Sequence, residues 1–155
     1  MRIGLLGYGA IAAEHARAMT KLGCSLVAVA GPRLDGAVAF AEAHGVARAY
    51  DAVDAVVGAG DIDAIVVASP SGAHAAQTVA SLEEGKHVLC EVPLGVSLVE
   101  TERATRHSVV SERCVMVCQT YRFFDPMLSL REMVAGDVLR HVVVRLMPNR
   151  TTNVG

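Results

Sequence analysis

Two glycines near the start of the chain have the spacing of a turn that binds phosphate groups. The stretch Gly7-Tyr8-Gly9-Ala10-Ile11-Ala12 fits the pattern G-x-G-x-x-G/A and follows an apolar run at residues 2–6. In this pattern the first glycine permits a tight turn, the second lets the backbone approach a pyrophosphate, and the small last residue lets helix and strand pack closely. Free N–H groups around Ala10 and Ile11 would face the anion. We therefore expect residues 7–11 to bind a dinucleotide; the alternative is an ordinary glycine-rich turn.

The next strand-like run ends without the carboxylate that usually binds the ribose of NAD. That carboxylate lies about 20 residues beyond the glycines and contacts the ribose 2′-hydroxyl. Here the stretch Val29-Ala30-Gly31-Pro32-Arg33-Leu34-Asp35 offers Arg33 instead. A guanidinium suits a 2′-phosphate, so we expect NADP to be preferred and NAD to be the alternative cofactor. The competing interpretation is that Arg33 is a solvated loop residue and Asp35 caps the next helix.

Polar side chains also follow two later strand-like runs. The first run continues as Ala68-Ser69-Pro70-Ser71-Gly72-Ala73-His74, and the second ends Cys90-Glu91-Val92-Pro93-Leu94. Loops at the carboxyl ends of parallel strands line the binding crevice of such sheets. A helix-capping serine and a partly exposed histidine are the alternative. His15 and the remaining histidines show no partner pattern, so surface or core roles are expected for them. The cofactor contacts expected in these two loops are Ser69, Pro70, Ser71, His74, Glu91 and Pro93.

Short β-branched runs alternate with longer alanine-rich segments as far as residue 118. Strict alternation predicts parallel strands with right-handed crossovers and helices on both faces. We therefore expect an α/β fold, a doubly wound parallel sheet of the Rossmann type, as a dinucleotide-binding domain over residues 1–118. The expected strands are 2–6, 25–30, 47–50, 64–68, 87–90 and 114–118, and the expected helices are 10–22, 35–44, 52–58, 72–84 and 97–111.

The pattern changes after residue 118. A helical stretch at residues 127–134 precedes an apolar run at 138–147 that is typical of a strand, with nothing after it to pair with. The charge also changes sign, since residues 1–118 carry 9 basic and 13 acidic side chains and residues 119–155 carry 5 and 3. We expect residues 119–155 to form the crossover helix and first strand of a second, incomplete α+β domain.

Composition excludes several classes of protein. Hydrophobic residues make up 52% of the chain and aromatic residues 4%, which suits a parallel sheet covered by alanine-rich helices. A net charge of −2 without a basic cluster argues against nucleic acid as a partner. The absence of a long apolar stretch or a signal peptide predicts a cytoplasmic protein without a membrane partner. Reduced thiols, rather than disulfides or metal ligands, are expected at Cys24, Cys90, Cys114 and Cys118.

Taken together, these motifs resemble the family of glucose-fructose oxidoreductase, inositol dehydrogenase and their relatives. In that family a strand ends Thr-Pro-Asn, and a histidine, Gly-Lys-His-Val and Glu-Lys-Pro follow in order. This chain has Ser69-Pro70-Ser71, His74, Gly85-Lys86-His87-Val88 and Glu91-Val92-Pro93. The resemblance covers the whole first domain. It implies an NAD(P)-dependent oxidoreductase, a cis bond before Pro93 and a homo-oligomer when the protein is complete.

The chain departs from the family pattern at two positions. Val92 stands where the family usually has lysine, and Ser71 where it usually has asparagine. The lysine is thought to position or polarise the reacting group, whereas valine has neither a donor nor a charge, so the catalytic residues stay unknown. A branch resembling 4-carboxy-2-hydroxymuconate semialdehyde dehydrogenase also has an apolar residue there. The Thr-x-Arg-Phe-x-Pro motif of that branch is similar to residues 120–126 of this chain, where the stretch is one residue longer. This similarity implies that Arg122 lies near the nicotinamide or an anionic substrate. The alternative is that the stretch is a structural loop that crosses to the second domain.

The resemblance leads to one functional interpretation and one alternative of another class. The first is the cofactor-binding half of an NADP-dependent dehydrogenase, which moves hydride between nicotinamide and a small sugar-like or hydroxy-acid-like substrate. Family acid, base or anchor residues should lie beyond Gly155, so the isolated chain is expected to bind cofactor without turnover. The alternative is a sensor or regulatory protein that kept the cofactor site and lost catalysis, which Val92 would suit. A scaffold that binds no nucleotide is a third, weaker interpretation.

Overall fold

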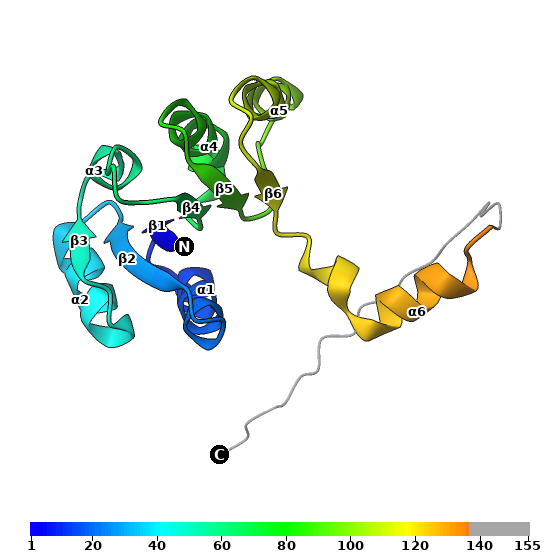
Figure 1. Ribbon diagram of the computed structural model, residues 1–155, viewed down its shortest axis with the longest axis horizontal. Helices are drawn as coiled ribbons and strands as arrows, with labels where there is room; N and C mark the ends of the chain where they lie inside the picture. The colour runs from blue at the N-terminus through cyan, green and yellow to red at the C-terminus, as the bar shows by residue number, and fades with distance from the viewer. Residues whose placement is uncertain (137–155) are drawn as a thin grey trace, which may run out of the picture. The chain divides into compact units, whose positions relative to one another are not determined.

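The computed structural model of the chain describes residues 1–136, and its first unit is a sheet of six parallel strands with helices between them (Figure 1). Its elements, in chain order, are β1 (Arg2–Leu6), α1 (Ala10–Lys21), β2 (Ser25–Ala30), α2 (Leu34–His44), β3 (Arg48–Tyr50), α3 (Val53–Val57), β4 (Ala64–Val67), the 3₁₀ turn η1 (Ser71–Ala73), α4 (His74–Glu83), β5 (His87–Cys90), α5 (Leu98–Val110) and β6 (Val115–Val117).

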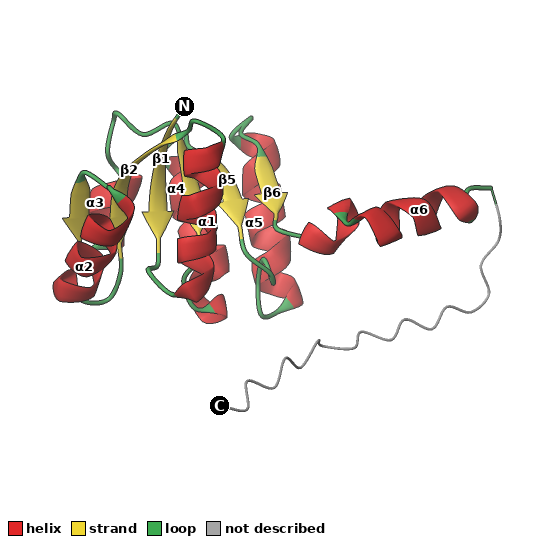
Figure 2. Cartoon of the chain, turned by 90° about the horizontal axis from the view of Figure 1, so that it is seen from below, coloured by secondary structure: helices red, strands yellow, loops and turns green. Residues whose placement is uncertain are grey.

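The strands lie in the order β3-β2-β1-β4-β5-β6. All neighbours pair in parallel, and Figure 2 shows the strand arrowheads pointing toward one edge of the sheet. The chain builds the sheet outward from β1 to β3 and then returns to the other side of β1 with β4. The strand order therefore reverses between β1 and β4, the point at which open α/β sheets form their binding crevice. The predicted doubly wound sheet is confirmed.

Alternating side chains of the strands divide the core between the two faces of the sheet. Leu5, which is fully buried, packs with the α1 and α2 side, where Ala12 and Ala16 present a small-residue surface to the strand. Leu6, also fully buried, packs with α3 and α4 on the opposite face. Figure 1 shows α1 and α2 on one side of the strands and α3, α4 and α5 on the other. Burial of each leucine contributes about 1.5–3 kcal/mol.

A buried lysine holds the amino-terminal side of the sheet together. Lys86 is only 7% exposed, and its Nζ donates hydrogen bonds of 2.8 Å to the carbonyl oxygens of Ala59 and Ile62. These carbonyls belong to the segment between α3 and β4, while Lys86 directly precedes β5. The ammonium therefore satisfies two backbone acceptors and fixes the entry into both strands.

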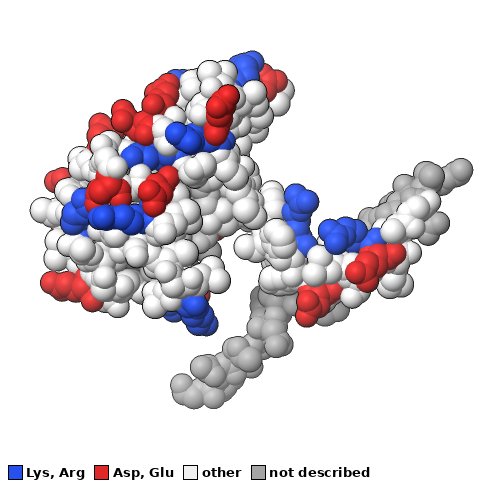
Figure 3. All heavy atoms as spheres, in the orientation of Figure 1, with Lys and Arg blue, Asp and Glu red and all other residues white. Residues whose placement is uncertain are grey.

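Most charged side chains lie on the surface. Figure 3 shows basic and acidic groups interspersed on the face that it presents.

The chain divides into two compact units, Met1–Gln119 and Thr120–Gly155. The described part of the second unit holds the 3₁₀ turn η2 (Thr120–Phe123) and α6 (Asp125–Met133), the helix expected at residues 127–134. The strand expected at residues 138–147 lies outside the described residues, so the assignment of a second domain stays a prediction. Among residues 1–136, none of the helices combines the length and the apolar composition that a membrane span requires.

Candidate functional site

The first glycine of the turn after β1 is required by its surroundings. Gly7 has a φ of +104°, which L-residues rarely adopt, and its N–H donates to the carbonyl oxygen of Ala30 at 2.7 Å. A Cβ at this position would lie 2.4 Å from the carbonyl oxygen of Ala68. The turn is therefore wedged between the ends of β2 and β4, and only glycine fits there.

The second glycine lies at an open helix end. Gly9 is the N-cap of α1 and is exposed, and a Cβ added to it would meet nothing within 4 Å. Among the described residues, no side chain caps α1 and none in its first turn is acidic. The first N–H groups of a helix have no partner within it. The N–H groups at Ala10 and Ile11, together with the positive end of the helix dipole, are therefore available to an anion.

A cavity of about 260 Å³ adjoins this turn. It lies where the strand order reverses, and it is smaller than the ~300–1,000 Å³ of pockets that enclose a whole drug-sized ligand. Its size therefore suits only one part of a ligand as large as a dinucleotide. The expected contacts Ser69 and Pro70 line it, and so do two polar residues that the sequence patterns did not indicate, Asp51 and Gln77. The remaining lining residues are Gly7, Ala30, Gly31, Pro32, Val53 and Ala73.

A larger hollow of about 330 Å³ lies elsewhere, lined by residues that include Gly85, His107 and Arg113. Gly85 and Arg113 precede β5 and β6, so this hollow is at the amino ends of the strands. The crevice at the carboxyl ends is the one that carries the glycine turn and the polar strand ends. We therefore place the candidate site there in spite of the smaller volume.

Tyr8, between the two glycines, is half-buried against the end of β2. A Cβ at Gly31 would lie 2.2 Å from Cε1 of its ring, and one at Gly36 would lie 2.7 Å from Cζ. The ring thus occupies space that any side chain at these two positions would fill. Tyr8 forms part of the wall between the glycine turn and the β2–α2 loop.

Arg33 is exposed at the start of α2 and is paired with Asp35. Its Nε donates to Oδ1 of Asp35 at 3.0 Å, and the N–H of Gly36 donates to the same oxygen at 2.9 Å. The guanidinium holds the pKa of Asp35 below its usual value, and the carboxylate in turn raises the pKa of Arg33. Both side chains face solvent, with exposed fractions of 73% and 67%. Contact of Arg33 with a 2′-phosphate stays a prediction.

The loop after β4 is fixed by internal hydrogen bonds. The hydroxyl of Ser69 donates to Oε1 of Gln77 at 2.6 Å, while Ser71 is exposed in η1. His74 is only 2% exposed, and its Nδ1 and Nε2 each lie 2.7 Å from a backbone carbonyl oxygen, of Pro93 and Ser69 respectively. His74 therefore ties the loop after β4 to the loop after β5. Its direct contact with a cofactor stays a prediction.

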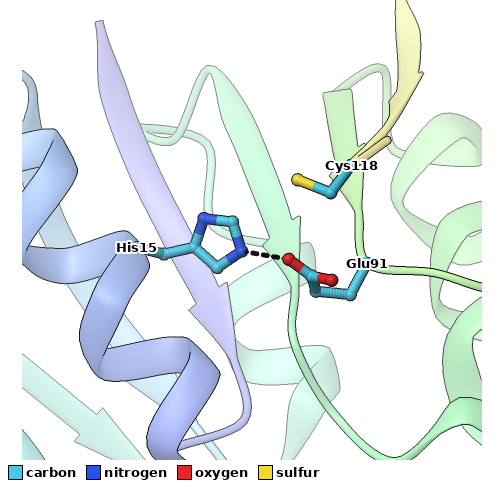
Figure 4. A group of neighbouring side chains, drawn as sticks. All are labelled: His15, Glu91 and Cys118. Carbon is cyan, nitrogen blue, oxygen red and sulfur yellow. Dashed lines mark hydrogen bonds and ion pairs between the residues drawn. The ribbon is translucent and has the colours of Figure 1, made fainter. Parts of the chain in front are cut away.

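The loop after β5 carries the Glu91-Val92-Pro93 motif. The Val92–Pro93 peptide bond is cis, and the Val92 side chain is 43% exposed. Glu91 is partly buried, and its Oε1 lies 2.8 Å from Nε2 of His15 in α1 (Figure 4). Glu91 therefore joins the end of β5 to the helix that follows the glycine turn.

A cysteine completes this group. One ring nitrogen of His15, one carboxylate oxygen of Glu91 and the sulfur of Cys118 all lie within 4.8 Å of one another. Figure 4 shows the three side chains together. Burial, together with the negative charge of Glu91, raises the pKa of the Cys118 thiol to about 11. No sequence pattern indicated that His15 or Cys118 would join Glu91, since His15 is on α1 and Cys118 follows β6, far from Glu91 in the chain. The last predicted contact, Arg122, lies in η2 of the second unit, and its role stays a prediction.

The model of an oxidoreductase family with an NAD-binding Rossmann fold matches residues 1–119. The chain belongs to this family. The family resemblance predicted from the motifs is therefore confirmed.

Relatives within the family include two named dehydrogenases. Inositol 2-dehydrogenase 1 of Saccharopolyspora erythraea is 38% identical over 93% of this chain and 44% of its own length. A 4-carboxy-2-hydroxymuconate-6-semialdehyde dehydrogenase of a Sphingobium species is 29% identical over 89% of this chain and 44% of its length. A scyllo-inositol dehydrogenase of Lactobacillus casei, solved with NAD(H) and scyllo-inositol, superposes with a TM-score of 0.81 and 26% identity over 86% of this chain and 40% of that one. The chain thus spans less than half the length of these relatives.

Proposed function

We propose that this chain is the cofactor-binding half of an NAD(P)-dependent dehydrogenase. The observation that carries the proposal is the open N-terminus of α1 at Gly9, next to a cavity at the reversal of strand order. The N–H groups of α1 would hold the pyrophosphate, and the cavity beside Ser69 and Pro70 would take the adenosine half. The nicotinamide ring supplies the hydride donor or acceptor when the cofactor is bound.

The substrate we propose is a small molecule with a hydroxyl or aldehyde group. In the oxidation direction, the carbon that bears the hydroxyl would lose a hydride to nicotinamide, and the hydroxyl proton would pass to a base. This base is not assigned within residues 1–136. The relatives named as inositol 2-dehydrogenases support a sugar-like substrate, and the semialdehyde dehydrogenase supports an aldehyde. We also propose that the complete protein is cytoplasmic and homo-oligomeric, and that the 155-residue chain alone does not turn over.

NADP is the cofactor that we propose is preferred. Pro32 lines the cavity, and Arg33 follows it directly, so its guanidinium is within reach of the end of β2. Its present partner, Asp35, is a single carboxylate in solvent. A phosphate offers more charge and more acceptor oxygens than a carboxylate, so Arg33 could exchange one for the other. Asp51, which also lines the cavity, would oppose this preference if it lay beside the phosphate.

Calorimetric titration of the 155-residue chain with NADPH, NADH and ATP tests both the dinucleotide site and the preference for NADP. We expect both dinucleotides to bind, NADPH more tightly, and ATP to bind weakly. Arg33→Ala should weaken NADPH at least about tenfold, or ~1.4 kcal/mol, and leave NADH unchanged. Arg17→Ala is the matched control, because Arg17 is an exposed arginine paired with Glu14 on α1. Equal affinities that Arg33→Ala does not alter would refute the NADP preference, and no dinucleotide binding would refute the site.

A sensor or regulatory protein is the second candidate, and Val92 favours it. The family pattern described above has a lysine at this position, and valine can neither donate a hydrogen bond nor carry charge. Steady-state assays of the complete protein, with NAD(P)⁺ and a panel of polyols, sugars and hydroxy acids, separate the two. Turnover on any of them supports the dehydrogenase. Tight cofactor binding without turnover on the whole panel, or on the corresponding aldehydes and ketones with NAD(P)H, supports the sensor.

A further inference from the structure

The register between β5 and β6 brings two possible metal ligands together. Cys90 pairs with Val117 across the two strands, and Cys90 and Val115, two residues before Val117, both pack in the core on the α3 and α4 side of the sheet. Since side chains alternate along a strand, the next residues, Glu91 and Cys118, emerge side by side toward α1. His15 lies one turn into that helix and faces them. Three separate elements thus direct an imidazole, a carboxylate and a thiol to one point (Figure 4).

The place where they meet is sheltered. The side chains of His15 and Glu91 are only 13% and 14% exposed, and Cys118 is partly buried. The contact between His15 and Glu91 is therefore largely shielded from solvent. The group is also separate from the cavity beside the glycine turn, since none of the three residues lines that cavity.

We propose that His15, Glu91 and Cys118 bind one divalent transition-metal ion, with zinc as the ion that these ligands fit best. Nitrogen, oxygen and thiolate sulfur are the ligand types of zinc, whereas magnesium and calcium take oxygen ligands. Zn–N and Zn–O bonds of about 2.0–2.2 Å and a Zn–S bond of about 2.3 Å place tetrahedral ligand atoms roughly 3.4–3.6 Å apart. The separations here run from 2.8 Å for His15 and Glu91 up to at most 4.8 Å. Side-chain rotations that shift the ligand atoms by ~1 Å would complete the site.

Such a site has the composition of a catalytic rather than a structural zinc centre. Three protein ligands leave a fourth position for water or a substrate oxygen. Glu91 lies at the carboxyl edge of the sheet, next to Val92, which offers neither charge nor a hydrogen-bond donor there. A metal ion at this point would supply the positive charge that residues 91–93 lack. The proposal stands on the three ligands alone and does not require that the dinucleotide site be correct.

Titration of the reduced, metal-free 155-residue chain with Co²⁺ tests the proposal, because a thiolate ligand gives cobalt a charge-transfer absorption band. We expect this band to saturate at one equivalent and to disappear when Zn²⁺ displaces Co²⁺. Cys118→Ser should abolish it, while Cys114→Ser, which removes the exposed cysteine, should keep it. His15→Gln should weaken binding at least ~10-fold, since even residues that only support metal ligands typically cost 10–100-fold.

Two results would overturn the proposal. One is the absence of a charge-transfer band in the wild-type chain. The other is a band that survives Cys118→Ser, which would assign it to another thiol. Circular dichroism of each variant shows whether the fold is retained, and the wild-type result does not depend on any variant. NADH titration of the same samples is a separate measurement, so loss of metal binding and loss of dinucleotide binding can be told apart. Without the metal, the His15–Glu91 contact is a hydrogen bond between α1 and the residue that follows β5.

Discussion

Alanine at Gly7 should destabilise the fold, whereas alanine at Gly9 should spare the fold and weaken dinucleotide binding. At Gly7 an L-residue with a φ of +104° costs about 1–2 kcal/mol. The new Cβ would also lie 2.4 Å from the carbonyl oxygen of Ala68, and forcing the ends of β1 and β4 apart adds about 1–3 kcal/mol. The expected loss is therefore ~2–5 kcal/mol. At ~2.1 cal/mol/K per residue of unfolding entropy, a unit of this size should melt ~8–20 °C lower.

The same calculation at Gly9 gives a different outcome. Its Cβ would meet nothing within 4 Å, so the cost is only that of a poorer N-cap, under about 1 kcal/mol. The methyl group would nevertheless occupy the space through which a pyrophosphate approaches the backbone. We expect NADH affinity to fall at least about tenfold, or ~1.4 kcal/mol.

Thermal unfolding followed by circular dichroism measures the first effect, and NADH fluorescence titration measures the second. Each variant serves as the control for the other, because they make the same chemical change two residues apart. The reasoning would be refuted if Gly7→Ala melted with the wild type. It would equally be refuted if Gly9→Ala bound NADH as tightly as the wild type.

Three further predictions test the surroundings of the site. Lys86→Met should lower the free energy of unfolding, measured in urea, by ~2–4 kcal/mol, because two carbonyl oxygens lose charge-assisted hydrogen bonds. Methionine keeps most of the apolar stem, so the loss reports on the ammonium group. A loss below about 0.5 kcal/mol would contradict the role of Lys86. Arg33→Ala should raise the pKa of Asp35 toward its ordinary value of about 3.9, which carboxylate NMR would measure. In the wild type the pair stabilises the fold above this pH, and this stability is lost as pH falls through the depressed pKa of Asp35; the variant should lack this contribution. An unchanged titration of Asp35 would show that the pair does not form. Gly31→Ala should cost ~1–3 kcal/mol by displacing the Tyr8 ring, and Tyr8→Ala in the same chain should recover most of it; additive losses would contradict the contact.

Much of the fold could be predicted because its signals are local. Runs such as residues 25–30 and 87–90 are short, rich in β-branched or apolar residues and bounded by glycine or charged residues, and the observed strands have the same bounds. The expected helix at 72–84 begins instead with the 3₁₀ turn η1, and α4 proper starts at His74. Pro70, just before the turn, is extended, so the helical segment begins after it.

The contacts that could not be predicted depend on register and on packing between elements. Glu91 was expected at the crevice because it ends a strand, but its partner His15 was not, since this contact depends on how α1 lies across the sheet. Cys118 joins them only because Cys90 pairs with Val117. Asp51 reaches the cavity from the end of β3, which lies next to β2 in the sheet although the sequence places α2 between them. The glycine turn needed none of this, because its chemistry is contained in six consecutive residues.

An amide NMR titration of the 16.3 kDa chain with NADH tests the cofactor site most directly. If the open end of α1 binds the pyrophosphate, the largest shift changes should fall on the amides of Gly9, Ala10 and Ile11. Smaller changes should fall on residues that line the 260 Å³ cavity, such as Asp51. Changes confined to the hollow at Gly85 and Arg113, or no changes at millimolar NADH, would contradict the assignment of this crevice as the dinucleotide site.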